Sequence, residues 1–291
     1  MTQPDLTQHF LELVRRTSTD LRPDVEQALR TAREREADGS AAQGALDTII
    51  KNVELAREKS TPICQDTGTP IFYVYYPQDW RTLDLKKQIS EAVAMATAKA
   101  YLRPNAVNSL TGKNSGNNLG EAFPSFHFHE WEEPYLKIDL VLKGGGCENV
   151  GVQHKLPDGK LGAGRNLEGV RRAVLDAVYQ AQGKGCAPAV IGVAIGGDRG
   201  SGYVESKKQF FRPLDDTHQN SELAALEARL TGEANSLGIG PMGFGGETTV
   251  LGVKISAIHR LPACYFVTVS YMCWADRHRT LLWRDGSVEI S

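Results

Sequence analysis

The sequence predicts a single mixed α/β domain over residues 1–291, with a helical N-terminal layer over about 1–58 and mixed β-sheets flanked by helices. Three observations predict this class. Apolar residues up to position 58 recur at helical spacing, later β-branched and aromatic stretches alternate with helical ones, and no repeat, low-complexity tract or linker divides the chain. With 41% hydrophobic and 23% charged residues, 291 residues suffice for one large folded domain.

Three helices are expected in the N-terminal layer. The first has Phe10 and Val14 on one face. The second begins at Pro23, a residue well suited to the first turn of a helix, and runs to about Arg35. The third carries apolar residues at helical spacing from Ala42 to Leu55.

Strands and helices are then expected to alternate. The predicted strands are Ile71–Tyr76, which Pro77 closes, Tyr135–Leu142, Ala189–Ile195, Thr248–Ile258 and Cys264–Tyr271. The predicted helices are 88–101, Leu167 to about Gln182, and Ser221–Leu237 with Ser221 as its cap. Pro104 disfavours helical geometry at Arg103, which therefore lies at a helix exit. A polar, glycine-containing loop over 110–120 is of the kind that often serves a site.

Composition excludes several classes of function. A formal charge of −2 gives no basis for a nucleic-acid partner, and no stretch of about 20 apolar residues is present to span a membrane. The N-terminus has neither the basic nor the apolar region of a signal peptide, so a cytoplasmic protein is expected. Five scattered cysteines are an odd number, which predicts thiols or thiolate ligands in place of a disulfide framework.

Two familiar site patterns are weak here. The run from Gly238 to Gly243 matches a dinucleotide-binding spacing, but it follows a predicted helix and contains Pro241, so we reject that interpretation. His127 and His129 share one face of a predicted strand, where a zinc pair is a minor alternative to ordinary polar residues. The remaining histidines at 9, 154, 218 and 278 are expected at the surface.

Cysteine spacing does not by itself distinguish ligands from inert thiols, because the chain has no C-x-x-C pair. The motifs in which the cysteines stand are more informative than their spacing. The motifs are Pro62-Ile-Cys64-Gln65-Asp66-Thr-Gly-Thr69, Lys143-Gly-Gly-Gly146 with Glu148-Asn149, Gly-x-Gly-Cys186-x-Pro, Gly238-Ile-Gly-Pro-Met-Gly-Phe-Gly-Gly246 with Thr248-Thr249, and Cys273-x-Ala-Asp-Arg277. In order and approximate spacing they resemble the iron–sulfur hydro-lyases of the class I fumarase and tartrate dehydratase family along nearly the whole chain.

The resemblance implies a [4Fe–4S] cluster held by Cys64, Cys186 and Cys273. One iron then lacks a protein ligand and can act as a Lewis acid on the substrate hydroxyl. The resemblance also implies that Gln65 and Asp66 contact the substrate, with Asp66 catalytic. The Gly146 backbone would approach the substrate, and Arg103 would bind a carboxylate, a task that suits its two-pronged donor geometry.

Two positions depart from the family pattern. Cys147 stands where relatives commonly have serine. Leu261 stands where many relatives place a histidine, twelve residues before the last cluster cysteine. His259 lies two positions away and would share a face with Leu261 if this segment were a strand, so the roles of His259 and Cys147 stay open.

The resemblance covers only the α half of the family, whose members also use side chains from a β half. It implies a separately encoded β subunit, without which the chain has little turnover, and an α–α dimer within an α2β2 assembly. The expected reaction is reversible hydration of fumarate to L-malate, with L-tartrate dehydration as the near alternative. A non-catalytic zinc-binding or structural protein is the alternative from another class.

Overall fold

The computed structural model describes residues 3–291, and its contacts divide into two compact units, each with its own β-sheet. Unit 1 comprises the chain up to Arg22, residues 52–145 and residues 277–291; unit 2 comprises residues 23–51 and 146–276. Helices flank a mixed sheet in each unit, which confirms the predicted α/β class. Met1 and Thr2, at the start of the predicted N-terminal layer, lie outside the described residues.

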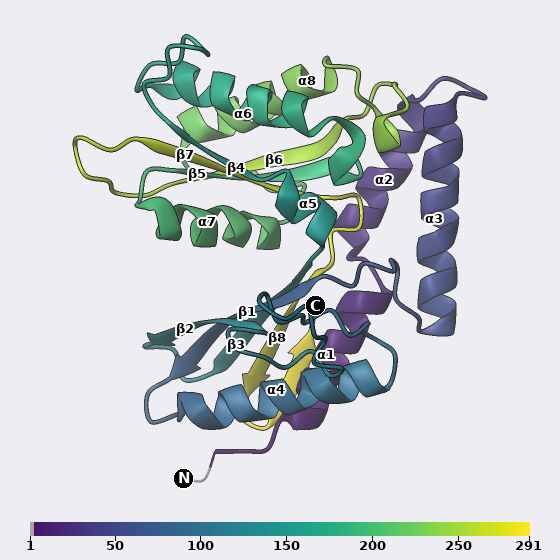
Figure 1. Ribbon diagram of the computed structural model, residues 1–291, viewed down its shortest axis with the longest axis vertical. Helices are drawn as coiled ribbons and strands as arrows, with labels where there is room; N and C mark the ends of the chain where they lie inside the picture. The colour runs from purple at the N-terminus through teal and green to yellow at the C-terminus, as the bar shows by residue number, and fades with distance from the viewer. Residues whose placement is uncertain (1–2) are drawn as a thin grey trace. The chain divides into compact units, whose positions relative to one another are not determined.

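Unit 1 is built on a five-stranded sheet of order β2-β1-β3-β8-β9. The strands are β1 (Thr69–Pro77), β2 (Ser125–Trp131), β3 (Leu136–Lys143), β8 (His278–Arg284) and β9 (Ser287–Ile290). β1 runs parallel to β2 and antiparallel to β3, and β3 in turn pairs antiparallel with β8. Helices α1 (Thr7–Thr19) and α4 (Thr82–Ala98) pack together on this sheet (Figure 1).

The predicted helix at 88–101 begins earlier and ends earlier than expected, as α4 (Thr82–Ala98). Its first turns carry several charged residues, which obscured the pattern. Leu85 and Ile89 nevertheless lie four positions apart, on one face, and are fully buried. Lys86 and Lys87, which lie between them, are exposed. The helix therefore forms because its apolar face is buried, although the local sequence is polar.

Unit 2 is built on a four-stranded sheet of order β4-β7-β5-β6. Its strands are β4 (Val152–Lys155), β5 (Ala189–Ile195), β6 (Val250–Ala257) and β7 (Phe266–Met272). Helices α6 (Leu167–Ala181) and α8 (Ser221–Asn235) cover one face, and α7 (Arg199–Lys208) covers the other (Figure 1). Asn220, and not the predicted Ser221, caps α8, because its side chain accepts from the backbone of Glu222 and Leu223.

The structure has further helices and short helical turns. They are α2 (Pro23–Arg35), α3 (Ala41–Lys59), α5 (Gly145–Asn149) and the short 3-10 turns η1 (Gln182–Gly185), η2 (Gln209–Phe211) and η3 (Pro241–Gly243). Since η3 spans three residues, no helix follows the Gly238 run, in agreement with the rejection of a dinucleotide site. None of the helices within residues 3–291 combines the length and apolar character that crossing a membrane demands.

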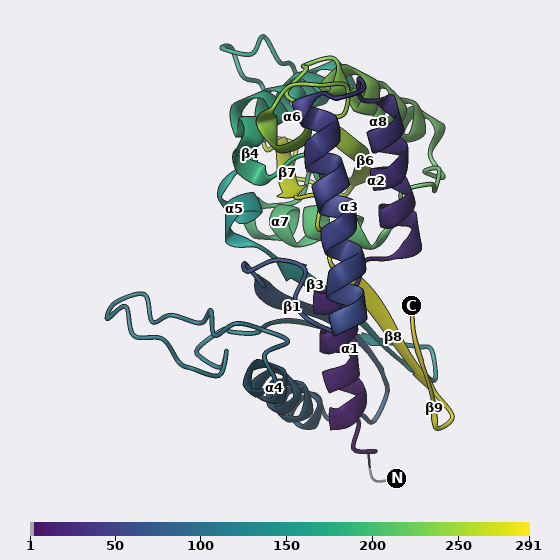
Figure 2. The same cartoon turned by 90° about the vertical axis from the view of Figure 1, so that its right-hand side faces the viewer.

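The predicted polar loop is present between α4 and β2 and extends away from the rest of unit 1 (Figure 2). Leu110 near its tip is 96% exposed. The base of the loop is ordered by the buried Asn118, whose Oδ1 accepts from the backbone N–H groups of Asn105 at 2.6 Å and Ala106 at 3.1 Å. The chain around Arg103 is therefore fixed although it carries no regular structure.

Candidate active site

The segment before β1 meets the segment after β3 in unit 1. Their antiparallel register pairs Thr69 with Lys143, so the residues preceding one strand lie beside those following the other. The Asp66 carboxylate spans this junction: Oδ2 accepts from the N–H of Gly145 at 2.7 Å, and Oδ1 accepts from the N–H of Gly68 at 3.1 Å. Two backbone donors thus hold one half-buried carboxylate in a defined orientation.

Gly68 must be glycine at this junction, and Gly144 leaves room for the Asp66 carboxylate. Gly68 has φ +79°, and a Cβ there would lie 2.7 Å from the carbonyl carbon of Lys143. A Cβ on Gly144 would lie 2.9 Å from Asp66 Oδ2. Gly68 therefore allows the two backbones to approach closely, and Gly144 leaves room for the carboxylate between them.

Replacing Gly68 by alanine is expected to lower the free energy of unfolding by about 3 kcal/mol, since a left-handed residue gains a Cβ that also clashes with backbone. The matched control is Gly112→Ala, at φ +69° with nothing within 4 Å of the added Cβ, for which about 1 kcal/mol is expected. Urea unfolding of both variants measures the difference. Equal losses would mean that the close approach to Lys143 contributes nothing.

Arg103 is tied to the same loop. Its backbone N–H donates to Thr67 Oγ1 at 3.1 Å, and its guanidinium donates to the carbonyl of Gln65 at 3.5 Å. The side chains of Gln65 and Arg103 are both exposed, so they are accessible to a small anion. Unit 1 thus brings together three predicted site residues: Gln65, Asp66 and Arg103.

Thr67, for which no role is predicted from the sequence, is fully buried, and its Oγ1 also accepts from Asn105 Nδ2 at 2.9 Å. Its place inside the Gln-Asp-Thr-Gly motif was the available signal. Cys64 begins the same loop and is half-buried. Gly146 belongs to unit 2, where it is exposed in α5.

Unit 2 brings together two of the predicted ligands, Cys186 and Cys273, which are 87 residues apart in sequence. β5 and β7 are antiparallel and pair Val190 with Met272, so the residues before β5 lie beside those after β7. The Trp274 N–H donates to the carbonyl of Cys186 at 3.1 Å. Cys186 itself adopts a left-handed conformation at φ 58° as it leaves η1, and both thiols are half-buried.

Tyr271 lies among these cysteines and was not singled out by sequence. Its side chain is 2% exposed, and its hydroxyl has no hydrogen-bond partner among the described residues. Burial raises the pKa of this hydroxyl far above its usual value, and nearby Cys273, Cys186 and Cys147 act in the same direction. The group therefore stays protonated and keeps a hydrogen to donate.

These features of unit 2 fit an iron–sulfur group. Thiolates are the side-chain ligands that such clusters use, and a buried donor without a partner suits their sulfur atoms. No three His, Cys, Asp or Glu side chains within residues 3–291 gather in an arrangement that holds a metal ion. The three-cysteine ligand set accordingly stays a prediction. No disulfide joins any of the five cysteines.

Several sequence expectations are corrected. His278, expected at the surface, is 2% exposed, because β8 lies inside the sheet between β3 and β9. His259 and Leu261 follow β6 in a segment without regular structure, so alternation along a strand does not place them on one face. Cys264, expected on a core strand, precedes β7 in a turn where its N–H donates to the carbonyl of Leu261. His127 and His129 do share a face of β2, where they stack on Tyr73 and Tyr75.

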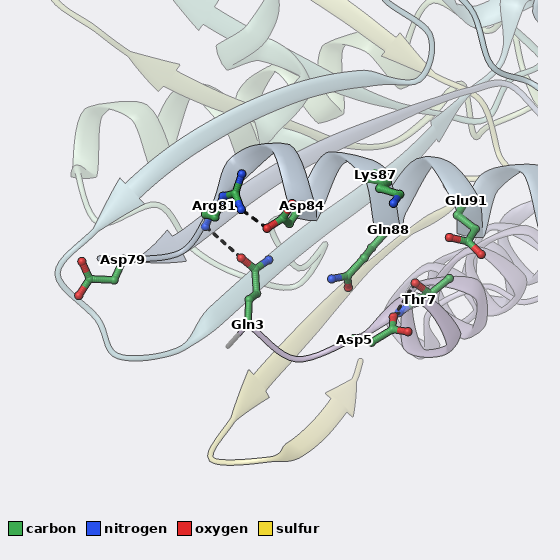
Figure 3. Close-up of a pocket in the computed structure, with 9 residues that line it drawn as sticks. All are labelled: Gln3, Asp5, Thr7, Asp79, Arg81, Asp84, Lys87, Gln88 and Glu91. Carbon is green, nitrogen blue, oxygen red and sulfur yellow. Dashed lines mark hydrogen bonds and ion pairs between the residues drawn. The ribbon is translucent and has the colours of Figure 1, made fainter. Parts of the chain in front are cut away.

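A polar groove of about 560 Å³ lies elsewhere in unit 1, between the start of α1 and α4 (Figure 3). Its lining residues are Gln3, Asp5, Thr7, Asp79, Arg81, Asp84, Lys87, Gln88 and Glu91. They include none of the predicted site residues. Internal contacts already engage several of them, including a bond from the Arg81 N–H to Gln3 and an ion pair between Arg81 and Asp84. We assign this groove no role.

The chain is similar to a known protein family and to several individual proteins. A family model described as fumarate hydratase (Fumerase) matches residues 7–281. The chain belongs to the fumarate hydratase (Fumerase) family. The resemblance seen in the motifs is thereby confirmed, and the matched range includes every predicted site residue of both units.

Individual relatives in the fumarate hydratase family carry two kinds of name. A putative fumarate hydratase class I of Geobacillus stearothermophilus is 50% identical over 275 residues, which are 94% of this chain and 54% of that protein. A putative L(+)-tartrate dehydratase subunit alpha of Methanocaldococcus jannaschii is 35% identical, over 92% of this chain and 93% of its own length. The L(+)-tartrate dehydratase subunit alpha of Escherichia coli K12 is 32% identical, over 95% and 90%. The chain therefore spans about half of the first relative and nearly all of the other two.

Proposed function

We propose that the chain is the α-type catalytic domain of a [4Fe–4S]-dependent hydro-lyase, with reversible hydration of fumarate to L-malate as its reaction. The observation that carries the proposal is the family match over residues 7–281, together with the carboxylate of Asp66 fixed beside Gln65 and Arg103. The 50% identity to a putative class I fumarate hydratase favours fumarate.

In this proposal Cys64, Cys186 and Cys273 hold the cluster, which when bound supplies a Lewis acid for the substrate hydroxyl. Arg103 binds one carboxylate of the substrate, and the exposed side chain of Gln65 orients it. Asp66 Oδ1 gives a proton to the departing hydroxyl in dehydration and accepts one from water in hydration. A base of the β half takes the proton from the neighbouring carbon. Loss of this proton and of the hydroxyl converts the hydroxy dicarboxylate into water and the unsaturated dicarboxylate.

The alternative reaction is dehydration of L-tartrate. It is favoured by the two relatives named as tartrate dehydratase α subunits, which this chain matches over nearly their full length. Both relatives are named as α subunits, which supports a separately encoded β subunit for this chain. We propose an α2β2 assembly in the cytoplasm along with it. One hydroxyl distinguishes malate from tartrate, so a few hydrogen bonds in the pocket would set the preference.

The decisive experiment is turnover of the chain, purified without oxygen with and without the β subunit of the same genome, on fumarate, L-malate and L-tartrate. We expect iron and sulfide near about four each per chain and activity only with the β subunit. A kcat/KM for L-malate at least about tenfold above that for L-tartrate supports the fumarase assignment. The reverse ratio supports tartrate dehydratase, whereas zinc without iron, or no turnover of either acid, would overturn the hydro-lyase proposal.

A further inference from the structure

The Tyr271 hydroxyl in unit 2 is not explained by the protein fold. Tyr271 is only 2% exposed, and its hydroxyl has no hydrogen-bond partner among the described residues. A hydroxyl in this state loses its bonds to water and gains none, so folding of the polypeptide alone favours phenylalanine at this position. The hydroxyl therefore indicates a partner that the polypeptide does not itself provide.

The ring that carries this hydroxyl is fixed. Tyr271 pairs with Ile191 in the β5–β7 ladder, and the whole of β7 is buried. Its ring also lies directly on the backbone of Gly185, where an added Cβ would come within 2.3 Å of Cε1 and 2.8 Å of Cζ. Because the buried ring rests on the last glycine of η1, the hydroxyl oxygen cannot move toward water to find a partner.

The two predicted ligands of unit 2 flank the ring that carries this hydroxyl. Cys273 follows Tyr271 by two residues, and Cys186 follows the glycine on which the ring lies. Both are cluster ligands in the proposed function, and a thiolate bound to iron accepts hydrogen bonds from outer groups.

We propose that Tyr271 is a positioning residue of the iron–sulfur site, donating its hydroxyl hydrogen to a thiolate sulfur of the Cys186 and Cys273 pair when the cluster is bound. This inference rests on the proposed function. The donor offsets charge on the sulfur, so it slows loss of iron and makes the reduced cluster more favourable. It touches neither substrate nor the reacting atoms.

The test compares Tyr271→Phe with the matched control Tyr265→Phe, which removes the hydroxyl of another largely buried tyrosine of the same unit, beside Arg260 and before β7. Full chains with their β subunit are loaded anaerobically with iron and sulfide. We expect Tyr271→Phe to lose iron to a chelator about tenfold faster than the unsubstituted protein and to have a lower cluster midpoint potential. Tyr265→Phe is expected to match the unsubstituted protein in both.

A second measurement separates this role from a packing role. Without the cluster, Tyr271→Phe is expected to unfold at the same or a higher temperature, because it removes a buried hydroxyl that has no partner; with the cluster it is expected to be less stable. Equal loss of stability in both states would overturn the proposal, as would unchanged iron loss and potential. If the unsubstituted protein itself binds no cluster, the proposed function fails instead, so the two failures are distinguishable.

Discussion

Replacing Cys186 by serine is expected to remove bound iron and sulfide and to reduce turnover to background. Serine keeps the size of the side chain and the contact of the Cys186 carbonyl with Trp274, but it lacks the thiolate that iron–sulfur clusters require. The same result is expected for Cys64→Ser and Cys273→Ser, because the proposed site has only three protein ligands. Iron and sulfide analysis of anaerobically purified protein, with assays of fumarate hydration, measures both effects.

Cys264→Ser is the control for this series. Cys264 is half-buried in the turn before β7, so its loss should leave iron, sulfide and activity near those of the unsubstituted protein. Because Cys264 lies outside the core strand, Cys264→Ser should lower the free energy of unfolding less than a substitution inside β7 would. Retention of cluster and activity in any of the three ligand variants would refute the assignment of that cysteine.

Asp66→Asn is expected to lower kcat about 10²- to 10⁴-fold, the range for loss of a positioned proton-transfer group. The substitution changes little else. An amide retains one acceptor oxygen for either the Gly145 or the Gly68 N–H, so the loop should lose one charge-assisted bond, about 2 kcal/mol. The measurement is steady-state kinetics on L-malate with the assembled α and β chains, alongside thermal unfolding.

The matched control for Asp66→Asn is Asp79→Asn. Asp79 is an exposed residue of the same unit and lines the polar groove. Its φ of 71° is one that asparagine also adopts, so the substitution adds no backbone strain. It is expected to keep kcat and KM unchanged. If Asp66→Asn retained more than about a tenth of the activity, its carboxylate would not be the proton-transfer group. A fall in kcat with unchanged KM, together with only the small loss of stability expected from one hydrogen bond, would support the catalytic assignment.

Much of the secondary structure was predictable because its causes are local. The spacing of Phe10 and Val14, the proline that opens α2, and the β-branched run of β5 each identify an element from a few neighbouring residues. Errors arose where tertiary burial decided the outcome. Charged residues hid the first turns of α4, and the central position of β8 buried His278, which the sequence presents as an ordinary polar residue.

The candidate site was predictable as a list of residues and unpredictable as an arrangement. Motif order, through the family resemblance, predicts Asp66, Arg103 and Cys186 as site residues. Thr67 and Tyr271 were missed, because a buried hydroxyl has no distinct pattern until its neighbours are known. Thr67 is recognised by its bonds to Arg103 and Asn105, and Tyr271 by the contact of its ring with Gly185.

The sequence by itself determined the fold class, the family, many of the strands and helices, and the residue types from which the chemistry must be built. Only the tertiary structure decided which of them meet. The Thr69–Lys143 register places Asp66 against Gly145, and the Val190–Met272 register places Cys186 beside Trp274. In each case antiparallel strand pairing joins two segments that are distant in sequence. The register of that pairing depends on hydrogen bonds and burial across the whole sheet. No short stretch of sequence contains this information.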